Sequence, residues 1–301
     1  LENLNVTGGV ARGETDVEGQ GGAVYNQGTL TLRNSTLYSN EAIGGLDADG
    51  QGGAIYNDRR TVIVINSTLS GNKATGGDSS DGVIASGSGQ GGAIFNRNGT
   101  LEITNATFAS NEVATGASTG TLGTAAGGAI FNEASGTSAR VTLVNTILAD
   151  SIGAADFDEI ENNSISITLG EGNLIESNNG FVDEFGSGTN PVVTSVDPNL
   201  GALKDNGGPT LTHALSQGSS AVDAGVDLDS NDYDSETITF DQRNFAGRKV
   251  NGAVDIGAFE LGASALQANA TYVVSTLVDE LDGDLSEGDL SLREAIALAE
   301  Q

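Results

Sequence analysis

The chain has 301 residues and no cysteine, methionine or tryptophan, and its 41 acidic residues against 12 basic ones give a formal net charge of −29. Such a surface repels nucleic acid and anionic membranes, which bind through clusters of Lys and Arg, and it attracts divalent cations instead. The lack of cysteine excludes a disulfide framework and a thiolate metal site, and no apolar run of about 18 residues predicts a transmembrane helix.

The first organised feature along the chain is a repeated hexamer, Gly-Gly-Ala-aliphatic-aromatic-Asn. It occurs four times, at 21–26, 52–57, 91–96 and 127–132. After each hexamer comes an alternating pattern of Val, Ile, Leu and Thr that ends in Asn, and then a second short apolar strand. Repeats of this length, made of strands rather than helices, are typical of a solenoid. One repeat therefore predicts one coil of roughly three short strands.

Stacked coils place equivalent residues above one another at the spacing of neighbouring strands, about 4.8 Å. The alternating strand then supplies two inward columns: Leu30, Val62, Leu101 and Val141, and Leu32, Val64, Ile103 and Leu143. Because stacked amides satisfy one another, we expect two ladders in which each Asn bonds the next: Asn34, Asn66, Asn105 and Asn145, and Asn40, Asn72 and Asn111.

The aromatic positions of the hexamers predict a further column: Tyr25, Tyr56, Phe95 and Phe131. Periodicity does not decide whether this column faces the core or whether the aliphatic column before it does: Val24, Ile55, Ile94 and Ile130. Successive hexamers begin 31, 39 and 36 residues apart, and the variation falls in a Gly-, Ser- and Asp-rich stretch such as 76–89. The repeat therefore predicts insertion loops at one corner of the coil, where they leave the ladders intact.

Four regions follow from these patterns. Coils extend over 1–195, although the repeat becomes degenerate after about residue 155, and 196–262 form a turn-rich region that closes the coils. A linker is expected at 263–270. The final stretch, 271–301, predicts a strand, an acidic loop and a helix, which begins at the N-cap Ser291 with Glu294 completing a capping box.

Several motifs of the turn-rich region resemble those of the choice-of-anchor Q family. They are the segment from Leu200 to Leu215 with Asp205, Pro209 and His213, and then Ala221-Val-Asp223-Ala-Gly225, Asp241-Gln-Arg243 and Asp255-Ile-Gly-Ala-Phe-Glu260. The tail from Leu290 to Ala295 is similar to the CSLREA motif of the same proteins, with Leu290 in place of its Cys. Together with the coils, these motifs cover most of residues 1–262.

The resemblance implies an all-β, right-handed parallel β-helix (a solenoid) from an exported bacterial surface protein, with a short C-terminal strand–loop–helix segment. The CSLREA segment normally precedes the coils, whereas here it follows them. The simplest interpretation is a section of a tandem array, in which 271–301 begin the next unit.

Two acidic runs are candidate calcium sites, because alternating oxygen ligands are how calcium loops begin. Their members are Asp227, Asp229, Asn231, Asp232 and Asp234 in the first run, and Asp279, Asp282 and Asp284 in the second. The first run lacks the Gly at its sixth position and the acid at its twelfth, which is Ile238. A solvated acidic loop is the alternative interpretation for each run. Calcium is the one cofactor that the sequence suggests.

An enzyme is the least favoured interpretation. His213 is the single histidine and lies inside a family motif, where a structural hydrogen bond is the simpler role. Parallel β-helices include lyases and hydrolases of polysaccharides, but these reactions need paired carboxylates, or acids beside a base, on an exposed strand face. The outward positions of the alternating strand hold only Glu102 and Arg33 as charged groups. No catalytic residue is assigned.

The leading hypothesis is a non-catalytic extracellular structural module of a cell-surface or matrix rod or filament. Its partner would be a copy of itself, stacked head to tail, because the open end of a β-helix exposes unpaired strand edges. The competing hypothesis is an adhesin that binds a glycan or another cell through the loops before each hexamer, with extracellular polysaccharide as partner. Both imply a secreted protein that binds no nucleic acid and does not insert directly into a membrane.

Overall fold

The computed structural model describes residues 1–162, 166–177, 193–228, 238–244, 247–250 and 253–262. The chain divides into two compact units, Leu1–Ser264 and Ala265–Gln301, and only the first contains described residues. The described part is all-β, with no helix. Within it, no helix is long and apolar enough to cross a membrane. The linker and the strand–loop–helix segment expected at 263–301 lie outside the described residues.

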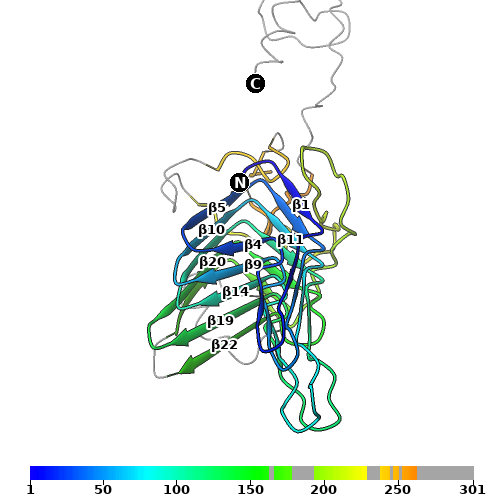
Figure 1. The fold of residues 1–301 in the computed structure, drawn as a ribbon. Coiled ribbons are helices and arrows are strands. Elements are labelled where there is room, and N and C mark those ends of the chain that lie inside the picture. Colours follow the sequence, from blue (N-terminus) through cyan, green and yellow to red (C-terminus); the bar gives the residue numbers. More distant parts are fainter. Residues whose placement is uncertain (163–165, 178–192, 229–237, 245–246, 251–252, 263–301) are drawn as a thin grey trace, which may run out of the picture. The chain divides into compact units, whose positions relative to one another are not determined.

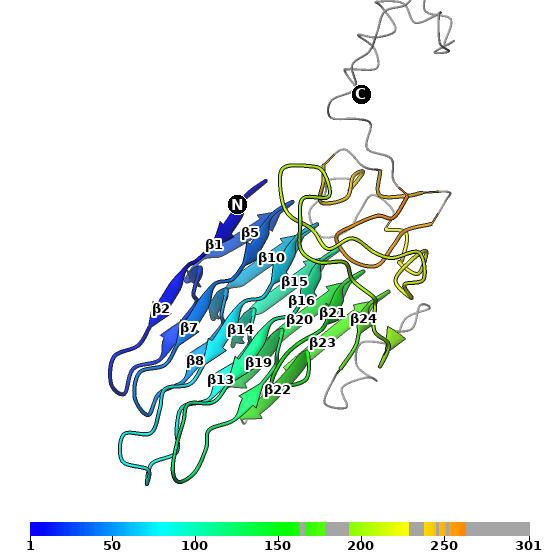
Figure 2. The ribbon, with the colours of Figure 1, turned by 90° about the vertical axis from the view of Figure 1, so that its right-hand side faces the viewer.

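Five parallel sheets make up the coils of the first unit, and the neighbouring strands of each sheet come from successive coils (Figures 1 and 2). We name each sheet after one of its strands. The β5 sheet contains β5 (Thr29–Arg33), β10 (Thr61–Ile65), β15 (Thr100–Thr104), β20 (Ala139–Val144) and β23 (Ser166–Glu171). The β6 sheet contains β1 (Asn5–Thr7), β6 (Thr36–Tyr38), β11 (Thr68–Ser70), β16 (Thr107–Ala109), β21 (Ile147–Ala149), β24 (Leu174–Ile175) and β25 (Val193–Thr194).

Three smaller sheets complete the coils. The β7 sheet contains β2 (Val10–Arg12), β7 (Glu41–Ile43), β12 (Lys73–Thr75) and β17 (Glu112–Ala114). The β8 sheet contains β3 (Gly19–Gln20), β8 (Gly50–Gln51), β13 (Gly89–Gln90) and β18 (Ala125–Ala126). The β9 sheet contains β4 (Val24–Asn26), β9 (Ile55–Asp58), β14 (Ile94–Arg97), β19 (Ile130–Ser135) and β22 (Phe157–Asn162).

A full coil thus has five short strands rather than the three expected, because a short strand on either side of the Gly-rich stretch, such as Lys73–Thr75 and Gly89–Gln90, also pairs with its equivalents. The register of the alternating strand agrees with the sequence: Val62 pairs with Leu30 on one side and with Leu101 on the other. Parallel sheets built from successive repeats are consistent with a parallel β-helix or solenoid.

The core lies inside the coils and consists of the inward columns. Val62, Leu69, Leu101 and Phe108 are 0% exposed and belong to one apolar cluster. The aliphatic column of the hexamers, with Ile55 among its members, belongs to the same cluster, whereas the aromatic column forms a separate one. The structure therefore decides the alternative that periodicity left open: the aliphatic column faces the core.

The two hexamer glycines have different roles. The first, as at Gly52, has a φ of 66°, a left-handed conformation that is strained for other residues. The second, as at Gly53, lies so close to the carbonyl oxygen of Gly92 in the next coil that a Cβ would clash with it. Close coil-to-coil packing at this corner therefore requires both glycines.

The described residues of 199–261 form what we call the covering segment. It has only isolated antiparallel bridges, such as Lys204 with Thr212. It lies along the outward face of the β6 sheet, across several coils, as Figure 2 shows. A second apolar cluster joins them, in which Ile147 and Leu174 of the coils pack with Leu215 and Ile256 of the segment. The segment therefore closes one side of the coils.

Candidate functional site

Buried amides form a continuous ladder at the last residue of each hexamer. The side-chain amide of each member donates to the next coil: Asn26 to Asn57 at 2.7 Å, Asn57 to Asn96 at 2.8 Å, and Asn96 to Asn132 at 2.7 Å. Our sequence reasoning missed this ladder, although the repeated Asn of the hexamer was its signal. It ties four successive coils together without any charged group.

Two further ladders have the same direction of donation. Asn40 donates to Asn72 at 2.9 Å and Asn72 to Asn111 at 3.0 Å, as the sequence predicts. In the β8 sheet, the side chains of Gln20, Gln51 and Gln90 are joined at 3.0 and 3.1 Å. The coil interior is thus held by apolar columns and by neutral amides.

The expected ladder at Asn34, Asn66, Asn105 and Asn145 is different. These residues follow paired strands and all have a φ of 45 to 51°, but only Asn145 bonds its neighbour, donating to Asn105 Oδ1 at 3.1 Å. The amide of Asn66 donates instead to the carbonyl oxygen of Phe240 in the covering segment, at 2.9 Å. The expectation that each Asn bonds the next is therefore wrong for this column, because the covering segment competes for its amides.

The aromatic column is stacked along the coils. Ring centroids lie 5.1 Å apart for Tyr25 and Tyr56, 5.3 Å for Tyr56 and Phe95, and 5.4 Å for Phe95 and Phe131. Tyr56 is 1% exposed and Tyr25 is 45% exposed. The column is therefore a small apolar cluster on the β9 sheet, separate from the main core.

Gln242 joins the covering segment to two coils. Its Oε1 accepts a hydrogen bond from Thr68 Oγ1 at 2.6 Å, and its Nε2 donates to Thr36 Oγ1 at 2.9 Å and to Thr210 Oγ1 at 3.0 Å. Gln242 is 0% exposed. These neutral contacts fix the covering segment at the level of β6 and β11.

His213 is a second buried joint. Its Nε2 lies 2.9 Å from Ser70 Oγ of β11, and its Nδ1 lies 2.7 Å from the carbonyl oxygen of Gly201. Because a carbonyl only accepts, Nδ1 carries the proton, and Nε2 of the neutral ring accepts from Ser70. Burial lowers the pKa of His213, and the hydrogen bond to the Gly201 carbonyl partly offsets this lowering. The single histidine therefore joins the segment to the coils, as the structural interpretation of the sequence expected.

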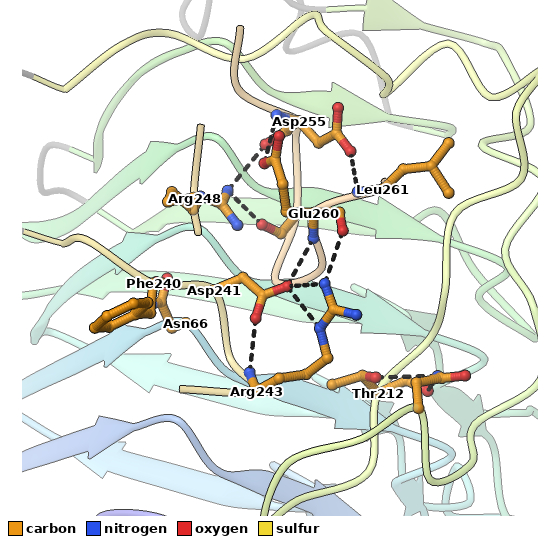
Figure 3. A network of polar contacts seen from close by, with 11 residues as sticks. Asn66, Thr212, Phe240, Asp241, Arg243, Arg248, Asp255, Glu260 and Leu261 are labelled. Carbon is orange, nitrogen blue, oxygen red and sulfur yellow. Dashed lines mark hydrogen bonds and ion pairs between the residues drawn. The ribbon is translucent and has the colours of Figure 1, made fainter. Parts of the chain in front are cut away.

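Asp241 and Arg243 form a buried ion pair (Figure 3). Asp241 Oδ2 accepts from Arg243 Nε at 2.8 Å and from Nη2 at 2.6 Å, and also from the backbone amide of Glu260 at 3.0 Å. The Arg243 guanidinium lies 3.9 Å from the centre of the Phe259 ring. Breaking this pair would leave a buried charge without a partner, which is costly.

Arg248, Asp255 and Glu260 lie next to that pair and are also buried. Arg248 Nη2 donates to Asn105 Oδ1 at 3.0 Å and to two backbone carbonyls of the segment. Glu260 Oε2 accepts from the Asp255 amide at 3.0 Å, and Asp255 Oδ2 accepts from the Leu261 amide at 2.6 Å. Burial raises the pKa of Asp255, and it raises the pKa of Glu260 to about 7 despite the attraction of Arg248.

Of the two calcium candidates, only part of the first can be placed. Asp227 is exposed and pairs with Lys249, while Asp229, Asn231, Asp232 and Asp234 lie outside the described residues. The second run, Asp279, Asp282 and Asp284, lies outside them entirely. Calcium binding at either run therefore stays a prediction.

Sequence reasoning missed a different group of carboxylates. Asp150, Glu176 and Asp197 are far apart in sequence, but one carboxylate oxygen of each lies within 4.8 Å of those of the other two. Burial, followed by repulsion from Glu176 and Asp197, raises the pKa of Asp150. Asp156 lies beside them in the same surface depression, with its oxygens bonded to backbone amides. A divalent cation would relieve the repulsion, but a group of partly exposed acids does not by itself define a metal site.

A mixed-charge column on the β9 sheet was also missed. Register places Asp58, Arg97 and Glu133 in successive coils beside the aromatic column. Arg97 Nε lies 3.5 Å from Glu133 Oε2, and Arg97 Nη1 lies 3.4 Å from the hydroxyl of Tyr56. The outward positions of the alternating strand do not include these charges, which lie at the end of the hexamer strand. Arg97 thus pairs with Glu133, whereas Asp58 pairs with its neighbour Arg59, as is common for charges on a protein surface.

In comparisons with known proteins, no family model matches the chain, and no curated protein or solved structure matches it significantly.

Proposed function

We propose that this chain is a non-catalytic structural module of an extracellular rod or filament, built as a right-handed parallel β-helix of the choice-of-anchor Q and CSLREA type. The observation that carries the proposal is the unbroken stacking of the coils. Apolar columns and neutral amide ladders run through successive repeats, and the single histidine joins the covering segment to them. Such construction favours mechanical continuity over a reaction site.

Self-association is the second part of the proposal. In the described residues, strands β1 to β4 have a neighbour on only one side. Val10 and Tyr25 of this coil are 59% and 45% exposed. Unpaired strand edges readily accept another strand. A further coil, from a second copy or from more of the same chain, could therefore continue all the ladders in the same register.

Charge sets the conditions for such stacking. Between Arg140 and Lys204 the sequence has no basic residue, and this stretch includes Asp150, Asp156 and Glu176. Two copies that meet through this end would repel unless cations screen them, since the Debye length falls to about 3 Å in 1 M salt. Assembly is therefore expected to increase with salt or calcium.

Electron microscopy and sedimentation velocity of the purified chain, with calcium and with chelator, test the proposal. Fibres or longer particles in calcium support it, and uniform monomers in both conditions contradict it. Val10→Lys should block assembly, because a charge on an edge strand opposes pairing. Val83→Lys is the matched control, because Val83 is an exposed aliphatic residue (82%) on a loop rather than an edge strand. Equal loss of assembly in both variants would contradict edge pairing.

An adhesin is the second candidate function, and the corner loops favour it. The loop around residue 82 and the next loop, around residue 120, are tied together: the Ser79 amide donates to the Ala117 carbonyl at 2.8 Å, and the Ser86 amide to the Thr121 carbonyl at 3.1 Å. Exposed aliphatic side chains project from them: Val83, Ile84 and Leu122. Ordered loops with exposed apolar groups are typical of interaction surfaces. Specific hits on a glycan array, lost in a loop-shortened variant and without self-association, would support an adhesin over a filament.

A further inference from the structure

Five buried charged side chains lie together where the covering segment meets the coils (Figure 3). Three are carboxylates, Asp241, Asp255 and Glu260, and two are guanidinium groups, Arg243 and Arg248. If all five were ionised, the group would keep one uncompensated negative charge in a buried place. Burying an uncompensated charge is strongly unfavourable, so one proton is expected to neutralise the group.

The hydrogen bonds indicate where that proton resides. Both oxygens of Asp241 and both of Asp255 accept backbone or guanidinium donors. Among the described residues, Glu260 Oε1 is buried without a hydrogen-bond partner. Arg248 donates through Nη2 to Asn105 and to two backbone carbonyls, and within this part of the chain its Nε and Nη1 have no hydrogen bond to a carboxylate. Glu260 is therefore the carboxylate least compensated by donors, and burial raises its pKa to about 7.

Among the described residues, the coil contacts around this group are neutral: Arg248 donates to Asn105, and the backbone of Gly257 and Ala258 lies against Ile147 and Thr107. One more acid lies close by in the covering segment, because the Asp223 amide donates to Asp255 and the Asp223 carboxylate repels it. On the covering segment, Lys249 next to Arg248 pairs with Asp227, and His213 forms a separate joint at Ser70. Burial also raises the pKa of Asp255, but both of its oxygens accept backbone amides, so we assign the proton of the group to Glu260.

We infer that the covering segment is a proton-sensitive closure on the outward face of the β6 sheet, held shut while Glu260 is protonated and loosened when it ionises. The closure acts through contacts that only this part of the segment makes. The Ala258 amide donates to Thr107 Oγ1, and the Gly257 amide to the Asn145 carbonyl. Loosening would uncover the Thr-lined outward face of β6, β11 and β16 while leaving the ladders unchanged. This inference does not depend on self-association.

Hydrogen exchange of the full chain at about pH 5.5 and 8.5, corrected for intrinsic rates, tests the closure. The readout is protection of the amides of residues 256–261, with the amides of β10 and β15 as internal reference. A carboxyl with a pKa of 4.5 when open and about 7 when closed predicts that opening rises roughly 30-fold over this range. The fold-change in opening of wild type is divided by that of Glu260→Gln, so that any effect of His213 titration cancels.

Wild type should lose protection of the amides of residues 256–261 as the pH rises, whereas Glu260→Gln should keep it. Glu112→Gln, an acid on the β7 sheet that pairs with Lys73, is the matched control and should behave like wild type. Equal pH dependence in wild type and Glu260→Gln overturns the inference, as does parallel loss in β10 and β15. Should Glu260→Gln fail to fold, a carboxyl NMR titration of wild type decides: a midpoint near 7 supports the closure, and one near 4.5 overturns it.

Discussion

The coils and the covering segment are stabilised by different chemistry within one unit. The coils are held by columns of 0% exposed aliphatic and aromatic side chains and by neutral amide ladders. The covering segment is held by the buried ion pair of Asp241 and Arg243, a buried histidine and a buried carboxylate whose pKa is about 7. Neutral ladders do not respond to pH, whereas buried titratable groups do. The repeat therefore supplies most of the stability, and the covering segment makes that stability depend on pH.

The largest effect is expected inside the coils. Phe108 is 0% exposed in the main core, and Phe108→Ala should lower the free energy of unfolding by about 3 to 5 kcal/mol. Chemical denaturation followed by circular dichroism measures it. A loss confined to the covering segment, with intact coils, would contradict the assignment of Phe108 to the coil core.

A somewhat smaller effect is expected in the covering segment. Arg243→Met removes the partner of the buried Asp241 carboxylate and should cost about 3 kcal/mol. The cost should appear as lost hydrogen-exchange protection in the segment, while β10 and β15 keep theirs. Arg12→Met, at an exposed position, is the control. Uniform loss over the molecule would erase the distinction between the two regions.

A ladder amide should come next. Asn96 accepts from Asn57 and donates to Asn132 and to the carbonyl oxygen of Gly99, so Asn96→Ala removes three buried hydrogen bonds and should cost about 2 kcal/mol. The loss should be the same at pH 6 and pH 8, because no ionisable group is involved. Thermal unfolding at both values checks this, and a pH-dependent loss would refute the neutral-ladder interpretation.

His213 should make the covering segment less stable in acid. Burial lowers its pKa in the folded state, so its contribution to stability is present above the ordinary value of 6.5 and is lost as pH falls below that value. His213→Gln should remove this acid sensitivity from the amides near Ser70. The direction is opposite to that of Glu260, whose stabilising effect is lost as pH rises above 4.5 toward about 7. Exchange at a series of pH values separates the two.

The smallest effect is expected at the coil surface. Lys73 and Glu112 are joined at 2.7 Å across β12 and β17, but both side chains are about a third exposed. Lys73→Gln should change stability by less than about 1 kcal/mol, and less still in high salt. A loss comparable to that of Asn96→Ala would show that surface charge stabilises the coils as much as the ladders do.

The sequence predicted the coils because their interactions repeat. The hexamer fixed the positions of the turns, and alternation fixed which residues face inward, so that Val62 pairs with Leu30 and Leu101 as expected. Whether the column of Tyr56 or that of Ile55 faces the core could not be predicted, because both alternate with the same period. Packing decides between them: Ile55 belongs to the main apolar cluster, and Tyr56 belongs to a separate one.

The covering segment was only partly predictable, because its contacts do not repeat. Its motifs marked a distinct turn-rich region, but Asn66 finds Phe240, and Thr68 finds Gln242, 174 residues away. No period links such positions, so the sequence does not predict that the amide of Asn66 bonds to the covering segment instead of to the next Asn of its column. The carboxylates of Asp150, Glu176 and Asp197 were missed for the same reason.

The amide ladders give the unit a polarity. In all three, each side chain donates toward the coil that follows in sequence, so their dipoles point the same way. The first coil therefore offers the carbonyl oxygen of Gln20 as an acceptor, and only a neighbour that presents N–H groups can extend that row. Two such ends brought face to face would set oxygen against oxygen. A chain of these units would thus have a plus end and a minus end, as vectorial polymers do, with growth rates that need not be equal.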